Sequence, residues 1–325
     1  MSRAAPRNEA TPHPPLWRTF RRELRVRSLL LALPLLSRLP HRLAVALGAL
    51  VGAVVYFIAG RERRLALEHL AIAFPQEDAS WRRRVARAAF RNLGKSAVEL
   101  AAVRGFSSRL PEVVELDADA KALLAAAHGE GKGVVFVSCH VGNWELLARR
   151  IVIEGYRCGT VAREAQDPRL TALLEKARAE VGLLTLWRGR PGLAKGLLRL
   201  LRGGGFVGLL IDQDTRVQGQ FVPFFGRLAF TPRAASDLAR RTGAPVIFGC
   251  VHRVKPLRHR VVLRRVPIAP TGDREADSLS LTAALTHLIE AEIREAPEEW
   301  VWMHPRWKTR PGQIGHQTET VEDSV

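Results

Sequence analysis

The chain has 325 residues, 47% of them hydrophobic, and carries a formal net charge of +18 at pH 7. That length and apolar content suffice for one large domain with a buried core. The excess of Lys and Arg predicts an anionic partner: a nucleic acid, a membrane surface or an acidic protein. The sequence contains no RRM signature and no paired Cys/His finger ligands, which argues against nucleic acid. Cys139, Cys158 and Cys250 lie far apart in apolar runs, which predicts reduced, buried thiols in a cytosol-facing protein.

The N-terminal part of the chain divides into a basic tail and an apolar segment. Residues 1–27 are rich in Ala, Pro and Arg, and we predict a disordered tail. Residues 28–60 are a predicted membrane-anchoring helical segment, whose longest apolar run spans roughly 25 Å as a helix, against about 30 Å for a hydrocarbon core. Basic residues flank it on both sides, which favours an anchor in the membrane interface over a spanning helix or a soluble hairpin. Pro34 interrupts the apolar segment too early for a cleaved signal peptide.

Residues 61–312 are predicted to form an α/β domain, and residues 313–325 a second disordered tail. Helices are expected at 61–105, and from Gly133 onward apolar strands alternate with helices. We predict strands at 133–138, 157–162, 183–187, 205–211, 245–251 and 260–266, and helices at 144–155, 168–182, 191–202, 231–242 and 278–295. Thr231 is an expected N-cap, and Gly243 the expected residue after that helix ends. This alternation predicts a largely parallel central sheet flanked by helices, with functional side chains where the strands end.

The most informative stretch is the junction between the strand at 134–138 and the following helix. His140 lies in the turn, and Glu145 in the first turn of the helix. A five-residue step turns a continuous helix by about 140°, but a strand-turn-helix corner can bring the two side chains together. The carboxylate would then orient one imidazole nitrogen, and the other would act as general base on a substrate hydroxyl. The alternatives are a surface turn with a capping histidine and, less favoured, Cys139 as a thiol nucleophile.

Arginines follow two of the other predicted strands. Arg163 comes after the strand at 157–162, whereas Arg188 and Arg190 come after the strand at 183–187. An arginine at the end of a strand can bind phosphate or carboxylate through two parallel hydrogen bonds. We therefore expect cationic density at the same edge of the sheet as His140.

An Asp-x-Asp sequence follows the strand at 205–211. Taken alone, Asp212 and Asp214 can bind Mg²⁺ or Mn²⁺ together with a nucleotide sugar, as in a metal-dependent glycosyltransferase. The preceding Gly203-Gly204-Gly205 lacks the spacing of a phosphate-binding loop, and no Lys-Ser/Thr follows it. A nucleotide site is therefore disfavoured.

Several motifs in a consistent order carry a resemblance to a known family. The segment from His140 to Glu145 resembles the H-F-G-N-W-E form of the H-x4-D/E motif of membrane acyltransferases. The D-Q-D, V-P-F-F-G and T-P sequences between Asp212 and Pro232, and the W-x-W-x-H-x-R-W-K sequence from Trp300, are similar to those of the bacterial lipid A biosynthesis (lauroyl/myristoyl) acyltransferase family. The resemblance covers residues 28–310. Pro305 stands where that family usually has arginine, a minor departure.

The resemblance implies transfer of a fatty acyl group from a thioester to a hydroxyl of a glycolipid, with His140 as general base and Glu145 as the carboxylate that orients it. It implies acyl carrier protein as donor and a phosphorylated glycolipid acceptor, either a lipid A precursor or a mannosylated phosphatidylinositol. An anionic membrane surface is a third expected partner; nucleic acid, metal and cofactor are not implied. Candidate substrate-binding residues are Asn143, Arg163, Arg188, Arg190, Asp212, Gln213, Asp214, Phe224, Phe225 and Thr231.

The expected location is the cytoplasmic face of the bacterial inner membrane. Trp300, Trp302 and Trp307 suit a membrane interface, because they mix with cations in a short segment. We expect a structural role for His304, with a second acid/base as the alternative. Donors for the oxyanion are the backbone N–H groups that begin the helix after Asn143, or a nearby arginine. The rival interpretations are the glycosyltransferase and a non-enzymatic basic binding protein.

Overall fold

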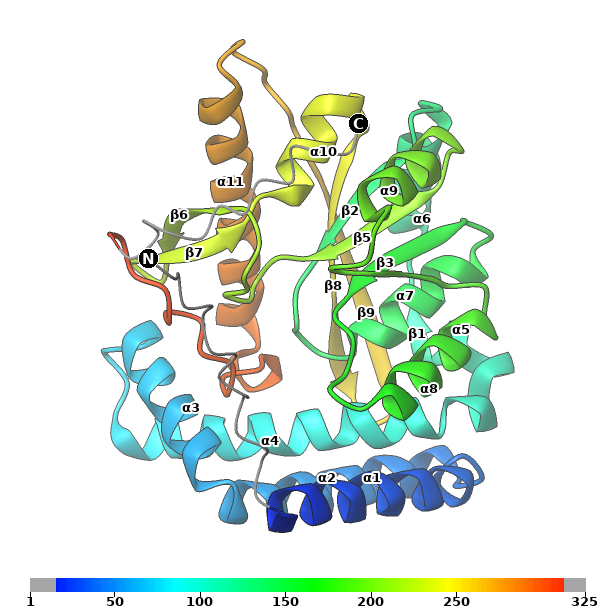
Figure 1. Ribbon diagram of the computed structural model, residues 1–325, viewed down its shortest axis with the longest axis vertical. Helices are drawn as coiled ribbons and strands as arrows, with labels where there is room; N and C mark the ends of the chain where they lie inside the picture. The colour runs from blue at the N-terminus through cyan, green and yellow to red at the C-terminus, as the bar shows by residue number, and fades with distance from the viewer. Residues whose placement is uncertain (1–15, 313–325) are drawn as a thin grey trace, which may run out of the picture.

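A computed structural model describes residues 16–312, and the predictions of disorder for residues 1–15 and 313–325 lie outside the described part (Figure 1). The helices are α1 (Leu16–Leu36), α2 (His41–Ile58), α3 (Gly60–Ala73), α4 (Ala79–Ala101), the 3-10 helix η1 (Val103–Arg109), α5 (Leu110–Val113), α6 (Ala118–Gly129), α7 (Trp144–Ile153), α8 (Pro168–Ala179), α9 (Leu193–Arg202), α10 (Ala234–Thr242), α11 (Arg274–Glu295) and the 3-10 helix η2 (Pro297–Glu299). The strands are β1 (Val114–Glu115), β2 (Val134–Ser138), β3 (Cys158–Ala162), β4 (Leu184–Trp187), β5 (Phe206–Leu210), β6 (Gly219–Phe224), β7 (Arg227–Pro232), β8 (Val246–Lys255) and β9 (Arg258–Val266).

The central sheet has seven strands in the order β1-β9-β8-β2-β5-β3-β4. The strands β8, β2, β5, β3 and β4 are mutually parallel, and β9 reverses direction by pairing antiparallel with β8. The predicted α/β fold with a largely parallel sheet is therefore confirmed. All six predicted strands are present, while the two-residue β1 is too short to leave a hydrophobic pattern.

Alternating side chains of β2 enter two separate parts of the core, because successive residues of a strand point to opposite faces. Val135 and Val137 belong to a cluster with residues of α9, α10 and α11, whereas Val134 and Phe136 belong to a cluster with residues of α6 and α7. All five residues of β2 are buried, as expected for a parallel strand covered on both faces. Packing on both faces fixes the position of β2 at the centre of the sheet, and the turn that follows it, with His140, starts from this fixed point.

The N-terminal helices lie along one side of the molecule, where α4 separates α1 and α2 from the sheet (Figure 1). Helix α1 begins at Leu16, so residues 16–27, which we expected to be a disordered tail, are helical instead. Their arginines alternate with apolar residues such as Val26, which is buried at 6% exposure. Among the described residues, α2 is the one helix long and apolar enough to cross a membrane by length and composition.

The stretch 219–232 differs from the prediction. It forms an antiparallel hairpin, β6–β7, joined by a two-residue turn. The turn residues Phe225 and Gly226 both have positive φ, 49° and 71°, as a tight hairpin turn of the I′ kind requires. Pairing continues to Thr231 and Pro232, so Thr231 is not an N-cap, and α10 begins only at Ala234. Gly243 follows the end of α10 with φ 64°, as predicted.

Candidate active site

His140 and Asp212 face each other because β2 and β5 are parallel neighbours. Ser138 pairs with Leu210 at the end of this ladder, and each functional residue follows two positions later. The His140 Nδ1 atom lies 2.8 Å from Asp212 Oδ1, and the backbone N–H of His140 donates to Oδ2 at 2.8 Å. The partner of the imidazole thus comes from a strand 72 residues away in the chain.

The Asp212 carboxylate is 1% exposed and is held ionised by its partners. Burial by itself would raise its pKa, but the charge and hydrogen bonds of His140, with a bond from Trp300 Nε1 at 2.8 Å, lower the pKa to about 2. An ionised carboxylate only accepts hydrogen bonds, so His140 Nδ1 carries the proton of this bond. When the ring carries a single proton, its lone pair is therefore on Nε2.

The rest of the loop fixes the position of the imidazole. The His140 ring contacts Trp144 edge-on at 4.7 Å between centroids, and its side chain is 19% exposed. Gly142 has φ 63°, and a Cβ on it would lie 1.9 Å from the carbonyl oxygen of Val251, so no other residue fits without movement. Its N–H donates to Glu299 O at 3.1 Å. His140 thus offers a partly exposed Nε2 from a rigid turn.

Glu145 does not pair with His140, which corrects the hydrogen bond that we expected. Its two carboxylate oxygens accept from Nε and Nη2 of Arg178 on α8, the former at 3.1 Å. Both side chains are nearly buried, at 11% and 8% exposure. The first turn of α7 directs Glu145 toward α8, and the carboxylate that lies next to the His140 ring is Asp212, after the end of β5. The spacing of His140 and Glu145 in the sequence could not predict this, because it carries no information about β5.

Asn143 supports the loop from behind. It caps α7, with Oδ1 accepting from the N–H of Leu146 at 3.4 Å, and Nδ2 donates to Glu99 at 3.0 Å. It is 3% exposed, so its amide is used within the protein rather than presented to solvent. Ser96 on α4 donates to the carbonyl of Gly142 at 3.3 Å. Neither Glu99 nor Ser96 could be predicted as part of the site, since a polar residue in a basic helix carries no distinctive sequence signal.

The predicted arginines gather at the same edge of the sheet as His140. Arg163 and Arg188 follow Ala162 and Trp187, which pair at the end of the β3–β4 ladder. Burial and the charge of Arg163 both lower the pKa of Arg188, as expected for neighbouring cations. Arg190 is exposed and paired with Glu164 at 2.6 Å. The Arg163–Arg188 pair lies two to three strands from β2, about 10–14 Å at the usual strand spacing.

The remaining predicted residues divide between the edge of the site and the core. Gln213 is half-buried beside the two aspartates, whereas Asp214 accepts from the N–H and hydroxyl of Thr309 at 2.6 and 2.9 Å. Because both aspartates are occupied by protein donors, the Asp-x-Asp sequence is not arranged as a pair of free metal ligands. Thr231 is fully buried and accepts from Arg306 at 2.6 Å.

Phe224 and Phe225 pack against other aromatic rings. Phe224 is fully buried, 5.7 Å from Trp300 and 4.9 Å below the guanidinium of Arg306, whose burial lowers its pKa to about 10. Phe225 is 5% exposed and 6.2 Å from Trp302. Neither ring lines the groove along α4 or the hollow between α3 and the segment 305–311, and a role in an acyl channel stays a prediction.

The C-terminal tryptophans are mostly internal, in contrast to the membrane interface that we predicted. Trp300 and Trp302 are 1% and 0% exposed, and their indole N–H groups donate to Asp212 and to Pro297 O at 2.8 and 2.6 Å. Amphipathic rings suit either a membrane interface or a buried site with an acceptor, and composition does not distinguish the two. His304 also lies near this site: burial lowers its pKa, and the charge of His140 lowers it further.

Within the described residues, one group of side chains resembles a metal site. Cys250, His252 and Glu292 are buried, with ligand atoms within 4.8 Å of one another. The group is already satisfied as an ion pair, because His252 contacts Glu292 at 2.9 Å and Glu299 at 3.2 Å. Burial opposes the charge on the imidazole, but these carboxylates raise the pKa of His252 to about 9.

Comparison with known proteins assigns the family. The model of bacterial lipid A biosynthesis acyltransferases matches residues 22–309, including the β2–α7 junction and the Asp212 segment. The chain belongs to this family. It is 28% identical over 281 residues to the lipid A biosynthesis palmitoleoyltransferase of Escherichia coli K12, covering 84% of this chain and 88% of the relative. It is 26% identical over 284 residues to the lauroyltransferase of the same organism, covering 85% and 89%, and 26% over 266 residues to a lipid A biosynthesis acyltransferase of Haemophilus influenzae, covering 78% and 80%. The chain is accordingly an acyltransferase, as its motifs predicted.

Proposed function

We propose that this acyltransferase moves a fatty acyl group from the thioester of acyl carrier protein to a hydroxyl of a lipid A precursor, using His140 with Asp212 as its carboxylate partner. The observation that carries the proposal is the 2.8 Å contact between His140 Nδ1 and a buried, ionised Asp212. The names of the relatives support a lipid A precursor as acceptor.

The chemistry needs one base and a site for an oxyanion. His140 Nε2 takes the proton of the acceptor hydroxyl as its oxygen attacks the thioester carbonyl. Asp212 stabilises the resulting imidazolium, as the carboxylate of a catalytic triad does. The tetrahedral intermediate collapses with cleavage of the C–S bond, and the imidazolium returns its proton to the departing thiolate. No protein nucleophile is required; Cys139 is fully buried, and burial and the charge of Asp212 raise its pKa.

Two features of the sheet edge support the remaining roles. The first N–H groups of an α-helix have no intrahelical partner, so those of Trp144 and Glu145 at the start of α7 are candidate oxyanion donors. The Arg163–Arg188 pair lies at a distance suited to a phosphate on an acceptor whose hydroxyl is at His140. Cys158 and the other two cysteines are free and buried, as expected for a protein in a reducing compartment. This supports a location at the cytoplasmic face of the inner membrane.

The test is an acyl-transfer assay with purified full-length protein in detergent and EDTA. Acyl carrier proteins loaded with several chain lengths, or the matching acyl-CoA, are mixed with a lipid A precursor or a mannosylated phosphatidylinositol, and products are measured by mass spectrometry. We expect an acyl mass increment on the lipid A precursor, lost in His140→Ala. Thioester consumed with an increment only on the other lipid would overturn the acceptor. Equal turnover by His140→Ala would overturn the mechanism.

A further inference from the structure

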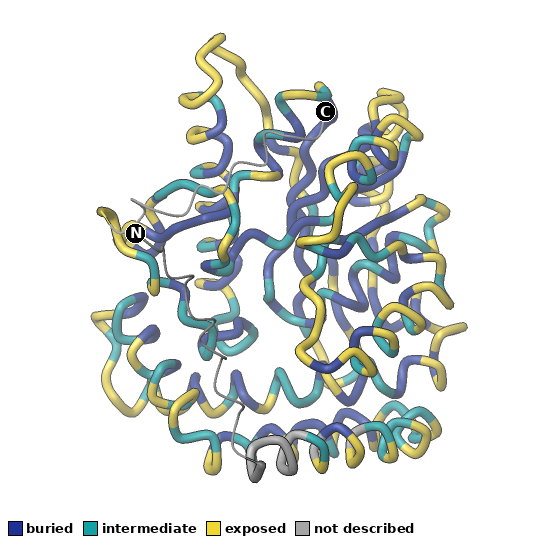
Figure 2. The backbone as a smooth tube through the Cα atoms, in the orientation of Figure 1, coloured by how far each residue is buried: buried dark blue, intermediate teal, exposed yellow. Residues whose placement is uncertain are grey.

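The outward side of α1 and α2 is unusually apolar. Of the large hydrophobic side chains that are exposed in the described residues, most belong to these two helices. On α2 they recur at helical spacing along one side, with Phe57 62% and Ile58 75% exposed. The row consists of Leu43, Leu50, Val51, Val54, Phe57 and Ile58. Figure 2 shows exposed stretches, in yellow, alternating with buried ones along the helices that border the molecule below α4. A surface of this kind needs a partner.

The opposite side of α2 is locked against α4, backbone to backbone. A Cβ on Gly52 would lie 2.2 Å from the carbonyl of Phe90, and one on Gly94 would lie 2.2 Å from the carbonyl of Gly48. Farther along, Tyr56 contacts the ring of Phe90 edge-on at 5.5 Å. The two helices therefore run side by side in opposite directions, and α2 cannot move away from α4 without losing this packing.

Both ends of α2 are also fastened to the globular body. At its start, His41 Nε2 lies 2.7 Å from Glu99, which in turn pairs with Arg253 of β8 at 2.7 Å. After its end the chain turns directly into α3, where His69 bonds to the carbonyl of Trp302 at 2.8 Å. Both ends of α2 are thus attached to the same globular domain. When this domain lies on one side of a membrane, both ends must lie on that same side.

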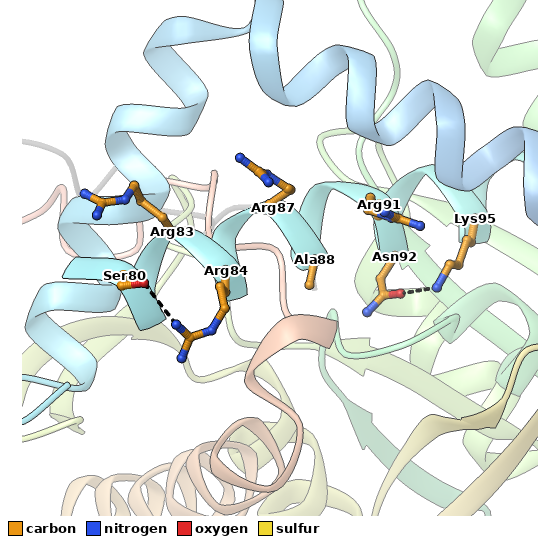
Figure 3. A pocket seen from close by; sticks show the side chains of 8 residues that line it. All are labelled: Ser80, Arg83, Arg84, Arg87, Ala88, Arg91, Asn92 and Lys95. Carbon is orange, nitrogen blue, oxygen red and sulfur yellow. Dashed lines mark hydrogen bonds between the residues drawn. The ribbon is translucent and has the colours of Figure 1, made fainter. Parts of the chain in front are cut away.

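Helix α4 carries a cationic stripe beside this apolar side. Arg83, Arg87, Arg91 and Lys95 are spaced by four, so they share one face of the helix, and Arg84 lies next to Arg83. They line a groove of about 550 Å³ with no acidic residue in its lining (Figure 3). The lining consists of Ser80, Arg83, Arg84, Arg87, Ala88, Arg91, Asn92 and Lys95. Arg87 also lies over the rings of Tyr56 and Phe57, at 5.5 and 5.6 Å, where stripe and apolar row meet.

From this arrangement we infer that α2 does not cross the membrane but lies in the plane of one leaflet, with its apolar row among the acyl chains and the α4 stripe at anionic lipid headgroups. A crossing α2 would carry α4 through the hydrocarbon, and arginines there are costly. In the interface the same arginines reach lipid phosphates while the leucines are buried. The inference rests on the proposed membrane-bound acyltransferase and adds the orientation of its active site to the lipid surface.

Cysteine labelling tests the orientation. The native cysteines are buried, so Arg38→Cys before α2 and Arg61→Cys after it provide exposed reporters. The full chain is expressed in a Gram-negative host and treated with a membrane-impermeant maleimide, in spheroplasts and in inverted vesicles. We expect both positions to react from the same side. Reaction from opposite sides would show that α2 spans the membrane and would overturn the inference.

Fluorescence quenching tests the depth. A fluorophore on Leu50→Cys is compared with one on Leu279→Cys, an exposed leucine near the start of α11, in vesicles of phosphatidylethanolamine and phosphatidylglycerol. In Figure 1 helix α11 rises away from the side of the molecule that carries α2. We expect quenching at position 50 by a doxyl group near the headgroup, more than by one at the bilayer centre, and none at position 279. Strongest quenching from the bilayer centre, or none at either position, would contradict the interfacial placement.

The arginine stripe is tested separately. Replacing Arg83, Arg87 and Arg91 with Gln should weaken binding to phosphatidylglycerol vesicles at least tenfold at low salt, whereas Arg202→Gln, an exposed arginine of α9, should not. Unchanged vesicle binding together with a raised KM for acyl carrier protein would assign the stripe to that acidic protein and overturn its headgroup role. None of the binding and labelling measurements needs turnover, so they stay decisive if the proposed chemistry fails.

Discussion

Replacement of Asp212 by Asn tests the proposed catalytic pair of His140 and Asp212 most directly. Asp212 accepts three hydrogen bonds, two from His140 and one from Trp300. Asn has nearly the same shape but one acceptor oxygen and no charge, so it neither stabilises the imidazolium nor enforces the tautomer with the lone pair on Nε2. The corresponding change in a serine-protease triad lowers kcat about 10⁴-fold. We expect kcat to fall by roughly 10²–10⁴, which is about 3–5 kcal/mol of transition-state stabilisation.

The assay is single-turnover transfer of a labelled acyl group, with thermal unfolding followed by circular dichroism. The matched comparison is Glu145→Gln combined with Arg178→Gln, because removing Glu145 alone leaves Arg178 buried without its charge partner, at a cost of about 3–5 kcal/mol. We expect the folded double variant to keep its turnover within about tenfold of the wild type. A tenfold change corresponds to about 1.4 kcal/mol in the activation free energy, as expected for residues that do not touch the His140 ring. Near-normal turnover in Asp212→Asn, with severe loss in the folded double variant, would refute the reasoning.

Three further predictions concern the loop, the anion site and pH. Gly142→Ala should destabilise the fold by several kcal/mol, because φ is 63° and the new methyl meets the Val251 carbonyl; a melting curve as stable as the wild type would contradict this. Arg188→Gln should raise KM for the phosphorylated acceptor about tenfold with little effect on kcat, and a dephosphorylated acceptor should abolish the difference. Since the pKa of His252 is raised from 6.5 to about 9, its stabilisation is complete below pH 6.5 and is lost as pH rises through 9. Urea unfolding should show this loss, up to roughly 3 kcal/mol, in the wild type and not in His252→Gln.

Much of the fold could be predicted because its strands are short, apolar and separated by amphipathic helices. The hairpin at 219–232 could not, because Pro223 and Gly226 interrupt its alternation and Thr231-Pro232 looks like a helix start. Three glycines, Gly48 and Gly52 of α2 and Gly94 of α4, let the two backbones meet, and this contact, rather than any sequence period, decides how α2 packs on α4. The apolar content and basic flanks of α2 predicted an anchor in the membrane interface, and the contacts between α2 and α4 add the structural reason why α2 cannot cross the membrane alone.

In the candidate site, too, the sequence identified individual residues, but tertiary contacts decide which of them pair. Sequence motifs identified both His140 and Asp212, yet distance along the chain favoured Glu145 as the partner of the imidazole. What decides the partner is strand adjacency: Ser138 and Leu210 pair in register, so the residue two positions after each strand must meet its counterpart. A motif within one segment gives no information about which strand lies beside it. The order of the strands in the parallel sheet decides that β5, and therefore Asp212, lies beside His140.

Glu99 connects the candidate site with the helix α2 that we place at the lipid surface. This fully buried carboxylate of α4 accepts from Asn143, which caps the helix after His140, and it also pairs with His41 at the start of α2. The hydrogen bonds of His259 and His41 and the charge of Arg253 hold its pKa below the usual range despite burial, so it stays ionised. One side chain thereby joins the loop that carries His140 to the helix that we place at the lipid surface. The distance between His140 and that surface is consequently a property of the packed α2–α4 pair, and a lipid-borne acceptor can be presented to Nε2 at a constant height.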